Sequence, residues 1–229
     1  MTLFLFGRAS VPQQTEFPTE KGYYSEEVEK ILNDRIEQPF SKLLQYIDEI
    51  DFDSNSFILK PGFNETTKQF MNGLLARNPN TFKSAKKNSK YLQLYGQQAQ
   101  HDLTVITSIN EAVKMGLFDE YYPTFTVNRT EMPFVLPICG FYWYNKNKNI
   151  NLPITPRLAI TLVDKDMLDK LYKDNKIRMY LATKESEVIF LNYFAFHGQK
   201  KQGYGRIVAP MRRVLEDMQK VGESKTAEM

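Results

Sequence analysis

Apolar residues in the first half of the chain recur at steps of three and four residues, the spacing that places side chains on one face of an α-helix. The first such run lies between Glu26 and Ile50. Its apolar positions are Val28, Ile31, Leu32, Ile36, Phe40, Leu43, Leu44 and Ile47. Ser25 is a suitable N-cap, because its hydroxyl can accept a hydrogen bond from the first turn. Pro39 has no N–H group, so we expect it to kink or divide this helix.

Two further amphipathic helices are predicted from the same spacing. The first is capped by Asn64 or Thr66 and ends shortly before Pro79, because a proline disfavours helical backbone in the residue before it. The second contains the apolar positions between Leu103 and Phe118. The first half of the chain is therefore predicted to be mainly helical.

The central part of the chain is predicted to form strands. Residues 121–128 are expected to be extended, and residues 134–144 are rich in the aromatic and β-branched side chains that favour strands. Residues 158–163 form another apolar strand, and residues 145–151 are the natural turn before it. Prolines cannot donate ladder hydrogen bonds, so they are expected at strand ends, edges or bulges. Those in this region are Pro133, Pro137, Pro153 and Pro156.

The later part of the chain continues this pattern. A short helix is predicted at residues 164–173, with Asp164 or Asp166 as its cap. Two more strands are predicted at residues 178–183 and 187–197. The order of elements predicts an α+β fold.

The predicted α+β fold has N-terminal amphipathic helices, then a mainly antiparallel sheet, then a C-terminal helix. The mainly helical part spans about residues 25–120, the sheet part about 121–206, and the last helix 207–221. A chain of 229 residues can bury one substantial core. We therefore expect residues 1–229 to form a single composite domain.

Composition narrows the class of protein. Charged residues make up 25% and hydrophobic residues 42%, which is ordinary for a globular protein. The net charge of +3 is too small to indicate nucleic-acid binding by itself. The single cysteine, Cys139, excludes an internal disulfide and a multi-thiolate metal site. With no signal peptide or long apolar run, we expect a cytoplasmic protein with no membrane span, metal site or cofactor.

A basic segment in the helical half is one candidate binding site. The lysines Lys86, Lys87 and Lys90 are followed directly by Tyr91. Basic residues interleaved with aromatic rings can follow a phosphate backbone while stacking on bases. The alternative is an ordinary solvated helix face.

Two polar residues in the sheet half are further binding candidates. Arg157 follows a rigid Pro-Ile-Thr-Pro segment, and a fixed guanidinium can hold a carboxylate or phosphate. The alternative for Arg157 is an ordinary ion pair. Asn192 interrupts an apolar run, where it either hydrogen-bonds irregular backbone or marks the start of a helix.

Candidates for catalysis are few. His101, Glu131 and His197 could act as general acids or bases if the fold brings them together. Because His101 and Asp102 are neighbours on a helix, their side chains point in different directions and are not expected to act as a pair. A hydrolase or nuclease is therefore the alternative function.

Several short motifs occur in the order found in the bacterial and phage-associated domain of unknown function family 4238. They are Tyr23-Tyr-Ser25, Leu74-Leu-Ala-Arg-Asn-Pro79, Asn128-Arg-Thr130, Leu152-Pro-Ile-Thr-Pro156 and Phe190-Leu-Asn192. The chain resembles this family over most of residues 23–210. It lacks the family's His-Tyr-Val-Pro-Gln and Thr-Ser-Asp-Asn-Pro motifs, which indicates a shortened or repurposed member.

The sequence thus favours a non-catalytic binding protein. The resemblance implies a setting in mobile elements or phage conflict, but it supplies no reaction. The expected partner is a protein or a nucleic acid, and homo-oligomerisation is a further option because exposed aromatic residues can form a subunit interface.

Overall fold

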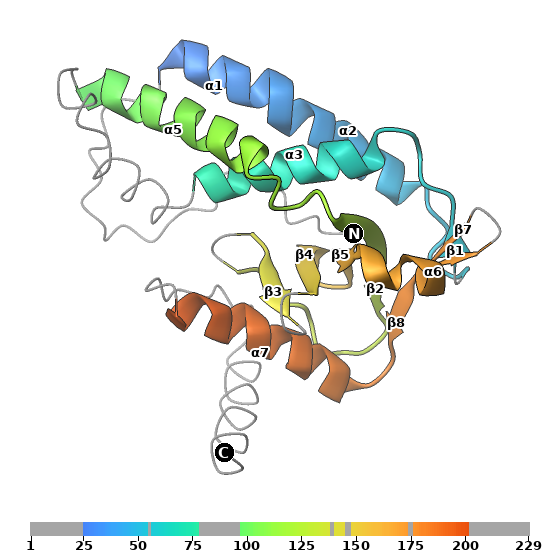
Figure 1. Ribbon diagram of the computed structural model, residues 1–229. Coiled ribbons are helices and arrows are strands. Elements are labelled where there is room, and N and C mark those ends of the chain that lie inside the picture. The colour runs from blue at the N-terminus through green and yellow to red at the C-terminus, as the bar shows by residue number, and fades with distance from the viewer. Residues whose placement is uncertain are drawn as a thin grey trace. The chain divides into compact units, whose positions relative to one another are not determined.

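The computed structural model describes residues 25–54, 56–77, 97–137, 140–144, 148–173 and 176–201 (Figure 1). These residues have the predicted α+β fold, with helices first and then mainly antiparallel strands. They fall into two compact units. The sheet unit lies within Ile50–Asn64 and Glu120–Met229, and the helical unit within Leu5–Glu49 and Glu65–Asp119. The predicted helix at 207–221 lies outside the described residues, and the single composite domain stays a prediction.

The first predicted helix is present and is divided, as expected. It consists of α1 (Glu26–Leu32), a π-helical turn (Asn33–Glu37) and α2 (Gln38–Asp48). The Ser25 hydroxyl accepts a hydrogen bond from the Val28 N–H at 3.4 Å, which confirms the N-cap. Pro39 is the second residue of α2, just after the π turn, and without an N–H group it cannot continue the α-helical ladder.

Two further helices among the described residues of this half are α3 (Phe63–Ala76) and α5 (Gln97–Lys114). The predicted caps of α3 are wrong, because the helix already begins at Phe63, after a turn at Gly62 with a φ of 82°. The end of α3 before Pro79 is confirmed. Within the helical unit the rings of Phe40 and Phe70 stack with centroids 3.6 Å apart.

The sheet unit contains a five-stranded sheet with the order β3-β4-β5-β2-β8. Its strands are β2 (Tyr121–Asn128), β3 (Tyr142–Tyr144), β4 (Asn149–Thr155), β5 (Leu158–Asp164) and β8 (Tyr180–Ala182). All neighbouring pairs are antiparallel except β2 and β8. Pro153 lies beside the register shift in β4, which confirms its predicted place at a bulge.

Smaller elements complete the unit. A second sheet has the order β1-β7-β6, from β1 (Ser56–Phe57), β7 (Lys176–Arg178) and β6 (Tyr172–Lys173). The predicted short helix is a 3₁₀ turn (Lys165–Met167) followed by α6 (Leu168–Leu171). Asp164 caps it by accepting a hydrogen bond from the Asp166 N–H at 3.0 Å, as predicted.

The strand predicted at residues 187–197 is wrong. These residues lie in α7 (Glu185–Lys201). The residues that α7 buries against the sheet are Val188, Leu191, Asn192 and Ala195, whose spacing of three and four is helical. Large apolar side chains also lie on other sides of α7, so the run resembled a buried strand.

The strand predicted at residues 134–144 is shorter than expected. Only β3 forms, because the N–H groups before it bond elsewhere. The Phe134 N–H donates to the Pro156 carbonyl at 3.0 Å, and the Val135 N–H donates to the Asn192 side chain at 2.9 Å. Pro137 has no N–H group to offer to a ladder.

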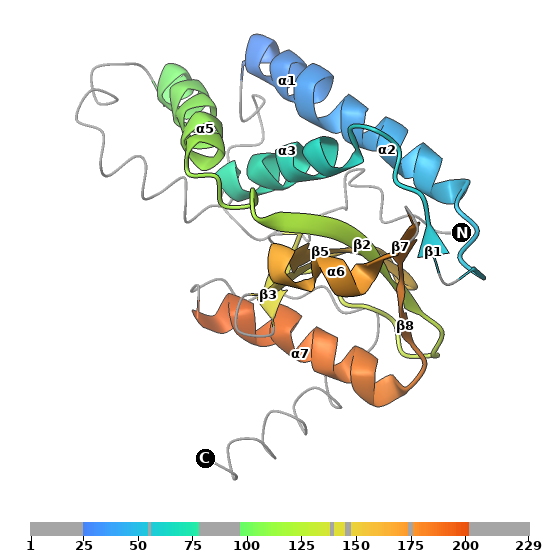
Figure 2. The ribbon, with the colours of Figure 1, turned by 45° about the vertical axis from the view of Figure 1, so that its right-hand side comes forward.

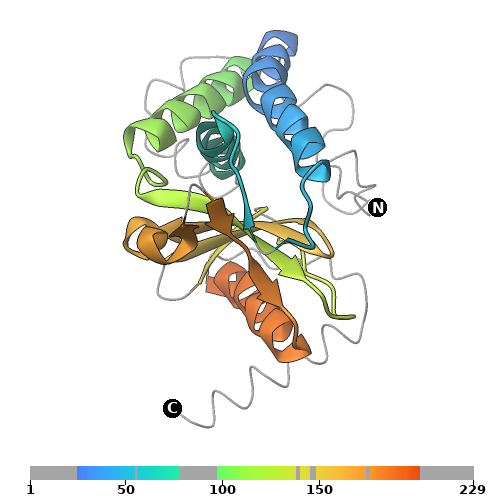
Figure 3. The ribbon, with the colours of Figure 1, turned by 90° about the vertical axis from the view of Figure 1, so that its right-hand side faces the viewer.

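The two faces of the five-stranded sheet differ in polarity. One is apolar, with Phe125, Val127, Ile150, Leu152, Ile160 and Leu162 buried on it. The alternate residues form the polar face, which carries Thr124, Thr126, Asn128, Asn151 and Thr161. Helix α7 packs along this polar face, as Figures 2 and 3 show from two directions. A buried polar face under a helix is the feature that creates the candidate site.

Candidate functional site

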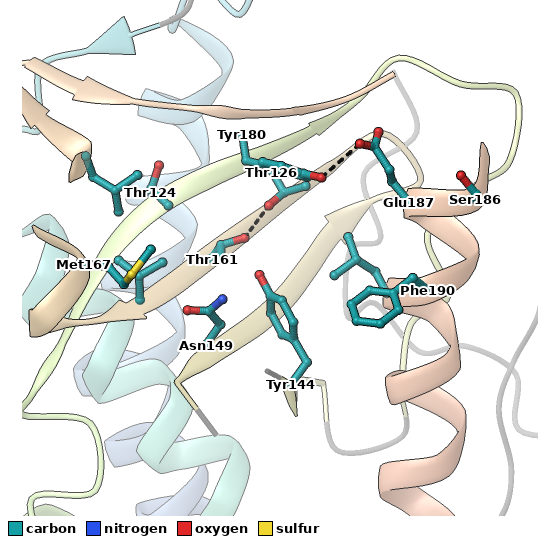
Figure 4. A pocket seen from close by; sticks show the side chains of 13 residues that line it. Thr124, Thr126, Tyr144, Asn149, Thr161, Met167, Tyr180, Ser186, Glu187 and Phe190 are labelled. Carbon is teal, nitrogen blue, oxygen red and sulfur yellow. Dashed lines mark hydrogen bonds between the residues drawn. The ribbon is translucent and has the colours of Figure 1, made fainter. Parts of the chain in front are cut away.

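A cavity of about 490 Å³ lies on the polar face of the sheet, between the strands, α6 and α7 (Figure 4). Thr124, Thr126, Thr161 and Asn149 line it from the strands, and we call them the polar wall. The aromatic group consists of Tyr144, Tyr180 and Phe190. The apolar wall consists of Val163, Met167, Leu171 and Leu191. The cavity therefore has the mixed lining typical of small-molecule sites.

A chain of hydrogen bonds crosses the sheet behind the polar wall. The Thr161 hydroxyl donates to the Asn151 Oδ1 atom at 2.8 Å, so its only proton is engaged. The Thr126 hydroxyl, 2.6 Å away, must then donate to Thr161. The Asn151 amide donates in turn to the Tyr142 hydroxyl at 2.7 Å. The direction of every bond in the chain is thereby fixed.

Thr124 is held in a similar way. Its hydroxyl donates to the Arg178 carbonyl at 2.6 Å, which links β2 to β7. Each threonine of the polar wall therefore gives its proton to another protein group. Any further hydrogen bond that these three hydroxyls form must therefore be one that they accept.

Asn149 adds a fourth acceptor. Its Oδ1 atom is buried and accepts no hydrogen bond among the described residues. Asn149 faces Tyr144 in the register of β4 and β3, and Figure 4 shows both side chains directed into the cavity. A buried polar atom without a partner is costly, so this oxygen favours a ligand that can donate to it.

The Tyr144 hydroxyl is uncharged at neutral pH. Burial raises the pKa of Tyr144 to about 12, although hydrogen bonding by Asn149 acts in the opposite direction. Burial also raises the pKa of Tyr142, which is fully enclosed. Neither phenol is ionised at neutral pH, so neither can serve there as a general base.

Glu187 is the single charged residue among those that line the cavity in the described part of the chain. Its carboxylate accepts hydrogen bonds from the Thr183 and Lys184 N–H groups at 2.8 and 3.0 Å. The Tyr180 hydroxyl donates to it at 3.2 Å. The backbone bonds from Lys184 and then Thr183 lower the pKa of Glu187. Glu187 therefore forms the carboxylate half of a capping box at the start of α7, by accepting the N–H of Lys184, and carries a negative charge at neutral pH.

The structure pairs two of the residues predicted from the sequence with each other. Arg157 forms an exposed ion pair with Glu131, with the Nη2 and Oε2 atoms 3.4 Å apart. The Glu131 side chain is 95% exposed, and neither residue lines the cavity. The arrangement matches the ordinary ion pair considered for Arg157.

Asn192 is fully buried in α7 and hydrogen-bonds irregular backbone, one of the two alternatives considered for it. Its Oδ1 atom accepts the Val135 N–H, and its amide donates to the Pro133 carbonyl, both at 2.9 Å. Asn192 lies inside α7 and does not start it. Its observed contacts are therefore structural.

The side chains of the remaining predicted residues are not among those described. Lys86, Lys87, Lys90 and Tyr91 lie outside the described residues. His101 belongs to α5 and His197 to α7, but the description does not extend to their side chains. Among the side chains that are described, no group of three His, Cys, Asp or Glu residues is placed to hold a metal ion. Roles for these residues in binding or catalysis stay predictions.

The residues of the polar wall were missed by the sequence analysis. A signal for them existed, because Thr124, Thr126 and Asn128 alternate with apolar residues, as do Asn149 and Asn151. Alternation of this kind indicates a strand with one polar face. The sequence does not reveal that α7 covers this face.

No protein-family model, curated protein or solved structure matches this chain. The resemblance to family 4238 therefore stays a prediction. In the described part of the chain, every helix is too short or too polar to cross a membrane.

Proposed function

We propose that the protein binds a small organic molecule in the cavity beneath α7 and acts by binding it, without catalysis. The observation that carries this proposal is the state of the polar wall. Its three threonine hydroxyls can only accept further hydrogen bonds, and the buried Asn149 Oδ1 atom has no partner among the described residues. A ligand with N–H or O–H donors would satisfy these atoms.

The chemistry of the lining supports binding more than catalysis. The hydroxyls of the polar wall are hydrogen-bonded to other protein groups, and the Glu187 carboxylate is held by two backbone N–H groups. Groups fixed in this way suit recognition, because they are already oriented. The proposal also keeps the cytoplasmic location, the protein or nucleic-acid partner and the setting in phage conflict that the sequence predicts.

The proposal can be tested with a matched pair of ligands. Benzamide and methyl benzoate have similar shapes, but only benzamide has N–H donors. Each is titrated into ¹⁵N-labelled protein, and the amide signals of Thr126 and Thr161 are followed by NMR. We expect saturable shifts with benzamide and weaker ones with methyl benzoate.

Two variants of α6 show whether the cavity is responsible. Leu171→Trp fills the cavity from its apolar wall and should abolish the shifts. Lys170→Trp adds the same ring to an exposed neighbour and should preserve them. In parallel, native mass spectrometry of gently purified protein should detect a small molecule bound to the wild type and absent from Leu171→Trp. Absence of both a co-purified molecule and any saturable shift would contradict the proposal.

A further inference from the structure

The charge of the lining distinguishes among ligands that can donate hydrogen bonds. Glu187 is negative, and in the described part of the chain the cavity lining holds no positive charge. Lys148 and Lys184 are sequence neighbours of lining residues, but both are exposed and neither lines the cavity. An anionic ligand would find hydroxyl donors in Tyr144 and Ser186, but it would also meet acceptor oxygens and the Glu187 carboxylate, with no cation among the described lining residues. That combination is unfavourable for an anion and favourable for a cation.

The aromatic group favours the same charge. Tyr144 and Phe190 both line the cavity, and Phe194 contacts the ring of each, with centroids 6.2 and 4.9 Å away. Phe194 thereby helps to fix both rings. The face of an aromatic ring attracts a cation because of its quadrupole. Tyr180 adds a third ring, which donates its hydroxyl proton to Glu187.

One feature opposes a cation. The cavity adjoins the N-terminal turn of α7, where the helix dipole places partial positive charge of roughly half an elementary charge. Glu187 lies in that turn and carries a full negative charge, and its carboxylate accepts the N–H groups of Thr183 and Lys184. The positive charge of Lys184 also acts on Glu187, but Lys184 does not line the cavity. The charge among the described lining residues is therefore negative.

We infer that the ligand is an organic cation, a protonated amine or guanidinium carried on an apolar or aromatic body. Its N–H groups would donate to Asn149 Oδ1 and to the threonine oxygens, and its charge would lie near Glu187 and the aromatic group. The body would fill the space against Val163, Met167 and Leu171. This inference rests on the proposed binding function and adds to it the charge of the ligand.

Three probes with the same ring test the charge. At neutral pH 2-phenylethylamine is a cation, 2-phenylethanol is uncharged and phenylacetate is an anion. Their dissociation constants are measured by NMR titration of the wild-type protein and of Leu171→Trp. We expect the amine to bind roughly tenfold more tightly than the alcohol, and phenylacetate to bind most weakly.

A matched pair of variants identifies the charge that is responsible. Glu187→Gln keeps a side chain that can still complete the capping box but removes the charge. It should weaken binding of the amine about fivefold and leave binding of the alcohol unchanged. Glu185→Gln removes an exposed charge from the same turn without touching the cavity, and it should change neither affinity more than about twofold. Independently of any variant, raising the salt concentration should weaken only the amine.

The outcomes separate this inference from the binding proposal. If the alcohol binds as tightly as the amine, and both depend on Leu171, the inference fails and the cavity remains a ligand site. If the amine binds equally well to Leu171→Trp, it binds elsewhere and the inference fails. If none of the three probes binds, the inference also fails, and the benzamide titration then decides the binding proposal.

Discussion

The hydroxyl oxygens of Thr126 and Thr161 lie 2.6 Å apart in the buried face of the five-stranded sheet. Because the Thr161 proton is engaged with Asn151, Thr126 is the donor of this pair. Thr161 therefore takes part in both hydrogen bonds, accepting one and donating the other. Substitution of Thr161 is for this reason the most direct test of the polar face.

We expect Thr161→Val to destabilise the fold by about 2 kcal/mol. The substitution keeps the shape of the side chain but leaves the Thr126 proton and the Asn151 Oδ1 atom without partners in a buried site. The measurement is the free energy of unfolding in urea.

The control is Thr104→Val in α5. Thr104 is equally buried, and its hydroxyl donates to the Gln100 carbonyl at 2.6 Å. That carbonyl can still accept the backbone N–H of residue 104 as part of the helix, so a loss of less than about 1 kcal/mol is expected. Equal losses in the two variants would show that the chain across the sheet has no special role.

Tyr144 gives a prediction about alkaline pH. Burial raises its pKa to about 12 in the folded protein, from 10.0 when exposed. The folded state therefore holds the Tyr144 proton more tightly than the unfolded state does. The contribution of this group to the free energy of unfolding is complete below pH 10. It is lost as the pH rises from about 10 to about 12, by a total on the order of 3 kcal/mol.

The measurement is the free energy of unfolding between pH 8 and pH 12. In Tyr144→Phe the free energy of unfolding should fall less steeply with pH over this interval, by the slope that corresponds to about one bound proton. The decline that remains belongs to other groups such as Tyr142, whose pKa is also raised by burial. An unchanged slope in Tyr144→Phe would contradict the prediction.

The capping box at the start of α7 gives a prediction about stability at low pH. Glu187→Ala should cost about 1 kcal/mol, while Glu187→Gln should retain most of the stability. Because backbone hydrogen bonds lower the pKa of Glu187, its contribution is present above pH 4.5 and is lost as the pH falls through its pKa in the folded state.

Thermal unfolding of both variants and the wild type, from pH 7 down to pH 3, tests this. The difference between wild type and Glu187→Ala should shrink at the acidic end. Glu185→Ala removes a neighbouring carboxylate for which no capping bond is expected, and it serves as the control.

Asn192 gives the largest predicted loss. In Asn192→Leu the Val135 N–H and the Pro133 carbonyl lose their partners in a buried site, so we expect a loss of about 3 kcal/mol. Arg157→Gln breaks an exposed ion pair and should cost less than about 1 kcal/mol. The two losses are compared by chemical denaturation, and similar values would refute the structural role of Asn192.

The sequence was sufficient for elements whose signals are local. The cap at Ser25, the division at Pro39 and the cap at Asp164 each depend on groups within a few residues, and all three are present. Strands β2 and β5 were also predicted, because their apolar runs are local signals. Strand β4 was not predicted, because the polar residues 149–151 were assigned to a turn and instead begin that strand.

The remaining features depend on contacts between distant residues. Helix α7 was taken for a strand, because its apolar residues contact both the sheet and one another. The role of Asn192 depends on Val135, far earlier in the chain. The cavity needs β2, β5 and α7 together, and no local pattern shows that these segments meet.

The order of the strands also has a consequence for folding kinetics. Strands β4 and β5 are joined by a tight turn at Pro156 and Arg157, so they can pair early from local contacts. Strand β8 pairs with β2 only after the chain has returned from β5 through α6 and the small sheet. Pairings between segments far apart in the sequence form more slowly than local ones. We therefore expect the cavity to be among the last parts to form, and a nascent chain to acquire it only after α7 has been synthesised.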